Sequence, residues 1–143
     1  MGTYLNPGNA VFQNSLNSKI YVDKSGLIEK TNEYLNTEQR YLCVSRPRRF
    51  GKSMAANMLA AYYDCSEDSS GLFDKLEISK SDSYQTHLNQ YDVLKLNMQD
   101  FLSLTHSVDD MLNLMQNRIV AELRRKYSEY ITDGHLVFAM QDI

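Results

Sequence analysis

The segment Arg46–Ser53, Arg-Pro-Arg-Arg-Phe-Gly-Lys-Ser, joins two apolar stretches of different period. Before it, Tyr41–Val44 is a continuous apolar run beside charged residues, which predicts a short parallel strand covered on both faces. After it, apolar residues from Met54 to Tyr62 recur at helical spacing, which predicts a helix beginning at Gly-Lys-Ser. A loop between a strand and a helix N-terminus is a place where backbone N–H groups bind phosphate.

Gly51, Lys52 and Ser53 match the second half of the phosphate-binding loop pattern GxxxxGK[ST]. In such a loop the backbone wraps the phosphates, the lysine neutralises the β and γ oxygens, and the hydroxyl ligates magnesium. Arg46 replaces the first glycine of the pattern, so the match is incomplete. The bare triplet would occur by chance in about one chain of this size in ten to twenty.

The charge of this segment favours an anion site. Lys52 would stand at a helix N-terminus, where its charge opposes the helix dipole, and three arginines lie just before it. Such an arrangement is costly unless an anion is bound. Pro47 biases Arg46 towards an extended backbone, which allows a residue other than glycine at that place. The competing interpretation is an ordinary turn in which Lys52 and Ser53 only start a helix.

Two further segments predict strands. Ile20–Val22 is a short β-prone run, and Val93–Met98 places alternate apolar residues on one face. At 143 residues, 43% of them hydrophobic, the chain can bury roughly two thirds of its unfolded surface, which fits one domain. We therefore predict a single α/β domain over residues 1–143, of the P-loop NTPase type (αβα) with an incomplete parallel sheet.

Helices are predicted in three further places. One follows Asp23-Lys24-Ser25, with Asp23 or Ser25 as its cap. A second follows Ser107 and carries three basic residues at 124–126, which compensate the helix dipole rather than bind nucleic acid. A third covers residues 135–143 and begins near Asp133.

Composition excludes several classes of protein. The net charge of −3 argues against general binding to nucleic acid or to an acidic membrane, and no segment is long and apolar enough to span a membrane. Cys43 and Cys65 lack the spacing of a zinc site, and Cys43 lies in an apolar run, as expected for a small buried residue. Two separate cysteines fit a reduced, cytoplasmic protein.

Two motifs resemble those of a known family. Tyr21–Ser25 reads Tyr-Val-Asp-Lys-Ser, and Arg46–Ser53 follows some twenty residues later, with Met58–Asp64 beyond it. Together they resemble the N-terminal portion of the bacterial AAA-ATPase-like family, which carries a YVDK[ST] segment and an RPR[RK]FGKS form of the Walker A loop. The similarity extends from about Tyr4 to Lys126. It implies a P-loop ATPase-like protein, in which the arginine in place of the first glycine is a family feature.

The resemblance implies ATP and magnesium as cofactors. By position, Lys52 would hold the β and γ phosphates, Ser53 would ligate magnesium, and the backbone of residues 48–54 would bind phosphate oxygens. Asp23 lies in the second motif and either contacts the nucleotide or caps a helix. No catalytic residue is assigned. The candidate nucleotide-binding residues are Asp23, Arg46, Pro47, Arg48, Arg49, Phe50, Gly51, Lys52, Ser53 and Met54.

An acidic Walker B strand, which hydrolysis requires, is not found in the sequence. Leu136–Met140 precedes Asp142 but has the pattern of a helix. Asp100 is a poorer candidate, because the resemblance implies that the predicted strand before it, Val93–Met98, precedes the Walker B strand. The resemblance places the acidic strand beyond Ile143, so we expect this chain to be truncated before it and not to hydrolyse ATP alone. The missing strand would leave apolar surface exposed, which predicts self-association.

Other partners and functions stay open at this stage. Members of the family commonly carry a nuclease-like C-terminal domain, so that domain and nucleic acid are expected partners of a longer protein, besides the nucleotide. One alternative to ATP binding is a basic loop that grips the backbone of a nucleic acid or another anion without hydrolysis. Another is an interaction module whose loop no longer binds nucleotide.

Overall fold

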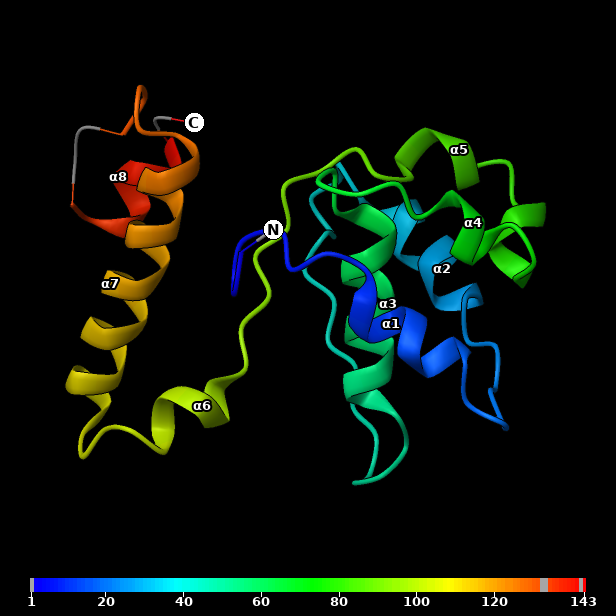
Figure 1. The fold of residues 1–143 in the computed structure, drawn as a ribbon, viewed down its shortest axis with the longest axis horizontal. Coiled ribbons are helices and arrows are strands. Elements are labelled where there is room, and N and C mark those ends of the chain that lie inside the picture. The colour runs from blue at the N-terminus through cyan, green and yellow to red at the C-terminus, as the bar shows by residue number, and fades with distance from the viewer. Residues whose placement is uncertain (1, 132–133, 142) are drawn as a thin grey trace. The chain divides into compact units, whose positions relative to one another are not determined.

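The computed structural model describes residues 2–131, 134–141 and 143, and in these parts the secondary structure is helical. Figure 1 shows the order of the helices along the chain. They are α1 (Ala10–Leu16), α2 (Gly26–Tyr34), α3 (Lys52–Tyr63), α4 (Ser70–Phe73), the 3-10 helix η1 (Glu77–Lys80), α5 (Tyr84–His87), α6 (Met98–Leu102), α7 (Val108–Lys126) and α8 (Leu136–Gln141).

The chain divides into two compact units, which we describe separately. The loop unit is Asn6–Val93 and contains α1 to α5 with η1. The α7 unit combines Met1–Leu5 with Leu94–Ile143 and contains α6, α7 and α8.

The core of the loop unit forms around α3. Met58, Ala61 and Tyr62 are buried and lie three or four residues apart, so they share one face of that helix. Phe12 of α1 stacks on Phe73 of α4 with ring centroids 4.9 Å apart. The buried cluster consists of Phe12, Ile28, Met58, Ala61, Tyr62, Phe73, Ile78, Tyr84 and Leu88.

The C-terminal end of α3 is fixed by hydrogen bonds. The Tyr62 hydroxyl donates to the Tyr84 carbonyl at 2.7 Å. Asp64, which is 1% exposed, accepts hydrogen bonds from the backbone N–H groups of Gly8 and Ser66, each at 2.7 Å. The Asn89 side-chain amide donates to the Asp64 carbonyl at 2.6 Å. This end of the helix is therefore joined to residues from three other parts of the loop unit.

In the α7 unit a carboxylate holds the N-terminal residues of the chain. Glu122 of α7 accepts hydrogen bonds from the backbone N–H groups of Thr3, Tyr4 and Leu5 at 2.7, 2.8 and 2.8 Å. Burial raises the pKa of Glu122, but these hydrogen bonds outweigh it and leave the pKa below its ordinary value. The apolar core of the unit comprises Leu5, Ile119, Val120, Leu123, Ile131 and Ala139.

The prediction of an α/β fold with a parallel sheet is wrong. In the described part of the chain the β-type pairing consists of isolated bridges, Leu5 with Leu94 and Asp64 with Tyr91. Tyr41–Val44 has no partner strand and is exposed to solvent, with 82% of Tyr41 accessible. A strand needs a neighbour to satisfy its N–H and C=O groups, and an apolar run alone does not supply one.

The other two predicted strands fail for the same reason. Ile20–Val22 is irregular, and both Ile20 and Val22 are exposed. Val93–Met98 makes one bridge through Leu94, and at Met98 the chain already enters α6. Cys43 was expected to be buried, but it is exposed because the run around it has no cover.

The predicted helices are found, with one difference in capping. α3 begins at Lys52, α2 follows Ser25, and α7 follows Ser107, whose hydroxyl accepts from the Asp110 N–H at 3.1 Å. Neither Asp23 nor Ser25 caps α2 with its side chain. α8 lies in the last predicted helix, but its predicted start near Asp133, like the candidate Asp142, lies outside the described residues.

Candidate functional site

The loop before α3 has an alternating backbone conformation. Arg49 and Gly51 have φ angles of 66° and 79°, in the left-handed region, and Phe50 between them does not have a positive φ. An alternation of left- and right-handed residues turns successive N–H groups towards one side, and such a concave backbone binds anions. The left-handed conformation costs a residue other than glycine about 1–2 kcal/mol, so Arg49 is strained.

The N-terminus of α3 adds further N–H donors. The first N–H of this helix to find its partner is that of Ala55, which donates to the Gly51 carbonyl at 2.9 Å. Within the described residues, the N–H groups of residues 52–54 make no backbone hydrogen bond. They are the donors that every α-helix leaves free at its start, where the helix dipole is positive.

Lys52 folds back over the loop. Its ammonium group donates to the carbonyl oxygen of Arg46 at close range and to that of Pro47 at 3.4 Å. The side chain thus turns back towards the first residues of its own loop, where it remains exposed. An ammonium group has three donors and turns freely, so it can exchange carbonyl oxygens for those of an anion.

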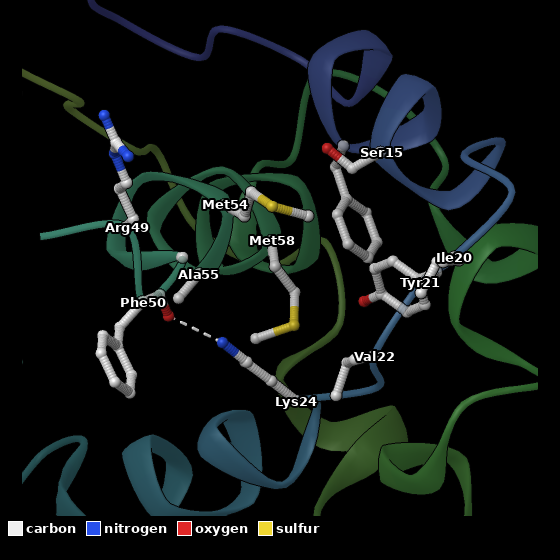
Figure 2. Close-up of a pocket in the computed structure, with 12 residues that line it drawn as sticks. Ser15, Ile20, Tyr21, Val22, Lys24, Arg49, Phe50, Met54, Ala55 and Met58 are labelled. Carbon is white, nitrogen blue, oxygen red and sulfur yellow. Dashed lines mark hydrogen bonds between the residues drawn. The ribbon is translucent and has the colours of Figure 1, made fainter.

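A second lysine reaches the loop from another part of the sequence. The ammonium group of Lys24, just before α2, donates to the Phe50 carbonyl at 2.8 Å, drawn as a dashed line in Figure 2. A Cβ atom on Gly51 would lie 3.0 Å from the Lys24 nitrogen. Glycine at 51 therefore serves both the positive φ angle and the close approach of Lys24.

Five cationic side chains gather at this loop: Lys24, Arg46, Arg48, Arg49 and Lys52. The four that belong to the loop and helix start are exposed, and so is Lys24. The ion pair found in the described part of the chain is Lys30 with Glu33, so none of the five is neutralised by a protein carboxylate there. Because like charges repel, the cluster favours an anionic ligand.

Asp23 has a structural role in the loop unit. Its two carboxylate oxygens accept hydrogen bonds from the N–H groups of Ser25 and Glu77, both at 2.8 Å. Burial raises the pKa of Asp23, but the hydrogen bonds and nearby Lys80 have the larger effect and lower it. Asp23 joins the start of α2 to η1, and this contact positions the adjacent Lys24.

An apolar cleft of about 360 Å³ adjoins the loop and is lined in part by residues of α1 and α3. Figure 2 shows the side chains of Met54, Met58 and Tyr21 turned towards it, whereas Arg49 and the ring of Phe50 point away from Tyr21. The cleft is lined by Phe12, Ser15, Ile20, Tyr21, Val22, Lys24, Arg49, Phe50, Gly51, Met54, Ala55 and Met58.

A second hollow, of about 470 Å³, adjoins the same loop. Lys24, Phe50, Gly51 and Ala55 line both spaces. The second hollow is further lined by Leu27, Val44, Arg46 and Lys52. Lys52 and Arg46 line this hollow and not the apolar cleft. These two cationic side chains therefore lie beside the cleft rather than in it.

The candidate residues from the sequence differ in their surroundings. Arg46 and Pro47 accept hydrogen bonds from Lys52, and Ser53 is exposed in the first turn of α3. Met54 presents its side chain to the cleft. Arg48 is exposed. The roles assigned to these residues towards ATP and magnesium stay predictions.

The apolar cleft was not predicted from the sequence. It combines Phe12 and Tyr21, which lie near each other in the chain, with Met58 far along it, and each has the pattern of an ordinary core residue. Asp100, the weaker acidic candidate, accepts a hydrogen bond from the Asn97 side chain at 2.9 Å and belongs to the α7 unit.

No group of three or more His, Cys, Asp or Glu side chains in residues 2–131, 134–141 and 143 could hold a metal ion. None of the helices described there combines the length and apolar character needed to cross a membrane.

Comparison with known proteins gives one result. A family model described as predicted AAA-ATPase matches residues 12–142, which is most of the chain and includes the loop, both lysines and the cleft. No curated protein and no solved structure matches the chain.

Proposed function

Because the chain belongs to the AAA-ATPase-like family, we propose that the loop of residues 46–54 binds the phosphates of ATP together with magnesium. The observation that carries this proposal is the pair of left-handed residues, Arg49 and Gly51, at the N-terminus of α3. Three helix N–H groups without backbone partners lie beside this loop together with its cationic side chains, and this combination suits an anionic ligand.

Each part of the loop has a distinct role in this proposal. The N–H groups of residues 52–54 donate to phosphate oxygens. Lys52 leaves the carbonyl oxygens of Arg46 and Pro47 and binds the terminal phosphates, where it neutralises charge. Lys24 keeps the Phe50 carbonyl turned away from the ligand, because its ammonium group already binds that oxygen.

The residues present fit a magnesium ion held jointly with the phosphates. Ser53 is exposed in the first turn of α3, next to Lys52, and its hydroxyl oxygen is a ligand of the kind magnesium accepts. Magnesium keeps several waters and takes few protein ligands in such sites, so one hydroxyl suffices. When bound, the ion would neutralise phosphate charge.

The proposal concerns binding and not hydrolysis. Both oxygens of Asp23 accept backbone hydrogen bonds, so we assign this residue a structural role and assign no base that activates water.

Isothermal titration calorimetry with ATP and magnesium tests the proposal. We expect the Lys52→Ala variant to lose about 100-fold in affinity, because two charge-assisted hydrogen bonds are worth about 3 kcal/mol. Lys19→Ala is the matched control, since Lys19 is also exposed but lies outside the loop and the cleft. An unchanged affinity for ATP in Lys52→Ala would refute the proposal. Binding of DNA with steep salt dependence, and no competition by ATP, would favour the basic-loop alternative.

A further inference from the structure

We propose that the apolar cleft beside the loop binds the nucleobase of the nucleotide. This inference rests on the proposed function, since the loop would hold the phosphates of the same molecule. Phe12, Tyr21, Met54 and Met58 provide the apolar contact surface. Of these residues, Met54 was among the candidates predicted from the sequence, but only for its backbone, and the other three were not.

The size and chemistry of the cleft fit a flat aromatic ring. Its volume of about 360 Å³ lies in the range of about 300–1,000 Å³ that small-molecule sites occupy. Thioether and aromatic side chains make favourable contacts with π systems, and methionine adapts its shape to the ligand. Phe12 and Tyr21 already meet edge to face, with centroids 6.3 Å apart, which gives the cleft a rigid aromatic wall.

Exposure differs between the floor and the rim of the cleft. Phe12 and Met58 are 2% and 1% exposed, so the core of the loop unit fixes them in place. Met54 and Val22 at the rim remain 44% and 65% exposed although both are apolar. An apolar rim over a preformed apolar floor is the pattern of a ligand site rather than of a completed core.

The cleft also has polar atoms that a base can use. Figure 2 shows the Tyr21 hydroxyl on the side of the ring nearest Met58 and Lys24. Burial and the charge of Asp23 raise the pKa of Tyr21, so its hydroxyl keeps its proton and can donate. Ser15 donates to the Val11 carbonyl at 3.2 Å within α1 and retains its capacity to accept.

Lys24 stands at the junction of the cleft and the phosphate loop. It lines both the cleft and the second hollow, and one of its three donors binds the Phe50 carbonyl. If the base of a nucleotide lay in the cleft and its phosphates lay on the loop, its ribose or first phosphate would lie next to the ammonium group of Lys24. The remaining donors of Lys24 suit either group.

The test compares ATP with inorganic tripolyphosphate, which has the phosphates but no base. Both are titrated with magnesium into the full chain by calorimetry. Ser15→Phe adds a ring on the cleft side of α1, and Asn14→Phe is the matched control, since Asn14 is exposed on the same helix but does not line the cleft. Val22→Ala removes a contact at the rim without filling the space, and Val22 lies outside the phosphate-binding loop.

We expect Ser15→Phe to weaken ATP binding about tenfold and Val22→Ala about fivefold, with the affinity for tripolyphosphate unchanged in both. Asn14→Phe should leave both ligands unaffected, and circular dichroism should show that all three variants are folded. If the wild type binds ATP no more tightly than tripolyphosphate, or if both cleft variants retain full ATP affinity, the base does not occupy the cleft and only this inference fails. If the wild type binds neither ligand, the proposed function fails and this inference fails with it.

Discussion

The two ends of α3 have opposite surroundings. At its C-terminal end Tyr62 and Asp64 are buried, and their polar atoms bind partners at 2.7 Å. At its N-terminal end Lys52 and Ser53 are exposed, and the loop before them carries cations without carboxylate partners. The buried end stabilises the fold, whereas the exposed end has donors and charges that a ligand can satisfy.

This contrast assigns stability and binding to different residues of one helix. An α-helix is stiff along its axis. Fixing the C-terminal end of α3 therefore also fixes the position of the N–H groups at its N-terminus. Substitutions at the two ends should therefore have different effects. Those at Asp64 should lower stability, and those in the loop should lower the affinity for ATP.

The largest effect is expected for Asp64→Ala. The change leaves two backbone N–H groups without their acceptor, that of Gly8 in a buried position and that of Ser66 in a partly buried one. We expect the free energy of unfolding to fall by about 3 kcal/mol, measured by urea denaturation. Asp68→Ala is the control, because Asp68 is exposed and accepts one hydrogen bond, from Ser70 at 2.9 Å. An equal loss of unfolding free energy in the two variants would contradict the conclusion that the buried C-terminal end of α3 stabilises the fold.

The next effect is expected for Gly51→Ala, at the exposed end. A Cβ atom here meets the Lys24 nitrogen at 3.0 Å and is strained at a φ of 79°. We expect about 1–2 kcal/mol lower stability. We expect the loss in free energy of ATP binding to exceed this loss of stability, because the added Cβ atom forces the loop to change shape. Gly71→Ala is the matched control, since nothing lies within 4 Å of the added atom. Full ATP affinity in Gly51→Ala would show that the loop geometry does not matter for binding.

The smallest effect is expected for Asp23→Asn. Its folded-state pKa is lowered, so the stabilisation by this carboxylate is present above its unfolded pKa of about 4 and is lost as pH falls through the folded value. Because Asp23 is exposed, we expect only about 0.5 kcal/mol, seen as a flatter pH dependence of stability in the variant.

The same variant distinguishes the structural role of Asp23 from the nucleotide contact that the sequence left open. A structural Asp23 leaves ATP affinity within twofold of the wild type at pH 7. A tenfold loss at unchanged stability would identify a nucleotide contact instead.

Local signals predicted the longer helices α2, α3 and α7, but not the short helices α4, η1, α5 and α6. The Gly-Lys-Ser triplet and the apolar spacing after it placed the start of α3 at Lys52, and Ser107 with acidic residues after it placed the start of α7. Helix hydrogen bonds join residues four apart, so a short stretch of sequence contains the information that fixes them.

Features that depend on distant residues were not predictable in this way. Tyr41–Val44 has the composition of a strand but finds no partner in the described part of the chain. The contact between Lys24 and the Phe50 carbonyl joins residues 26 apart, and the cleft combines α1 with α3. The loop could thus be found from its motif, whereas its second lysine contact and its apolar neighbour required the structure.

The central claim, that the loop before α3 binds phosphate, is tested most directly by NMR of the backbone amides during titration with tripolyphosphate and magnesium. We expect saturable chemical-shift changes concentrated in the backbone amides of residues 48–54, with smaller changes near Lys24 and none at Asp64. Shifts spread evenly over the exposed lysines and arginines of the chain, or no shift in residues 48–54, would contradict it.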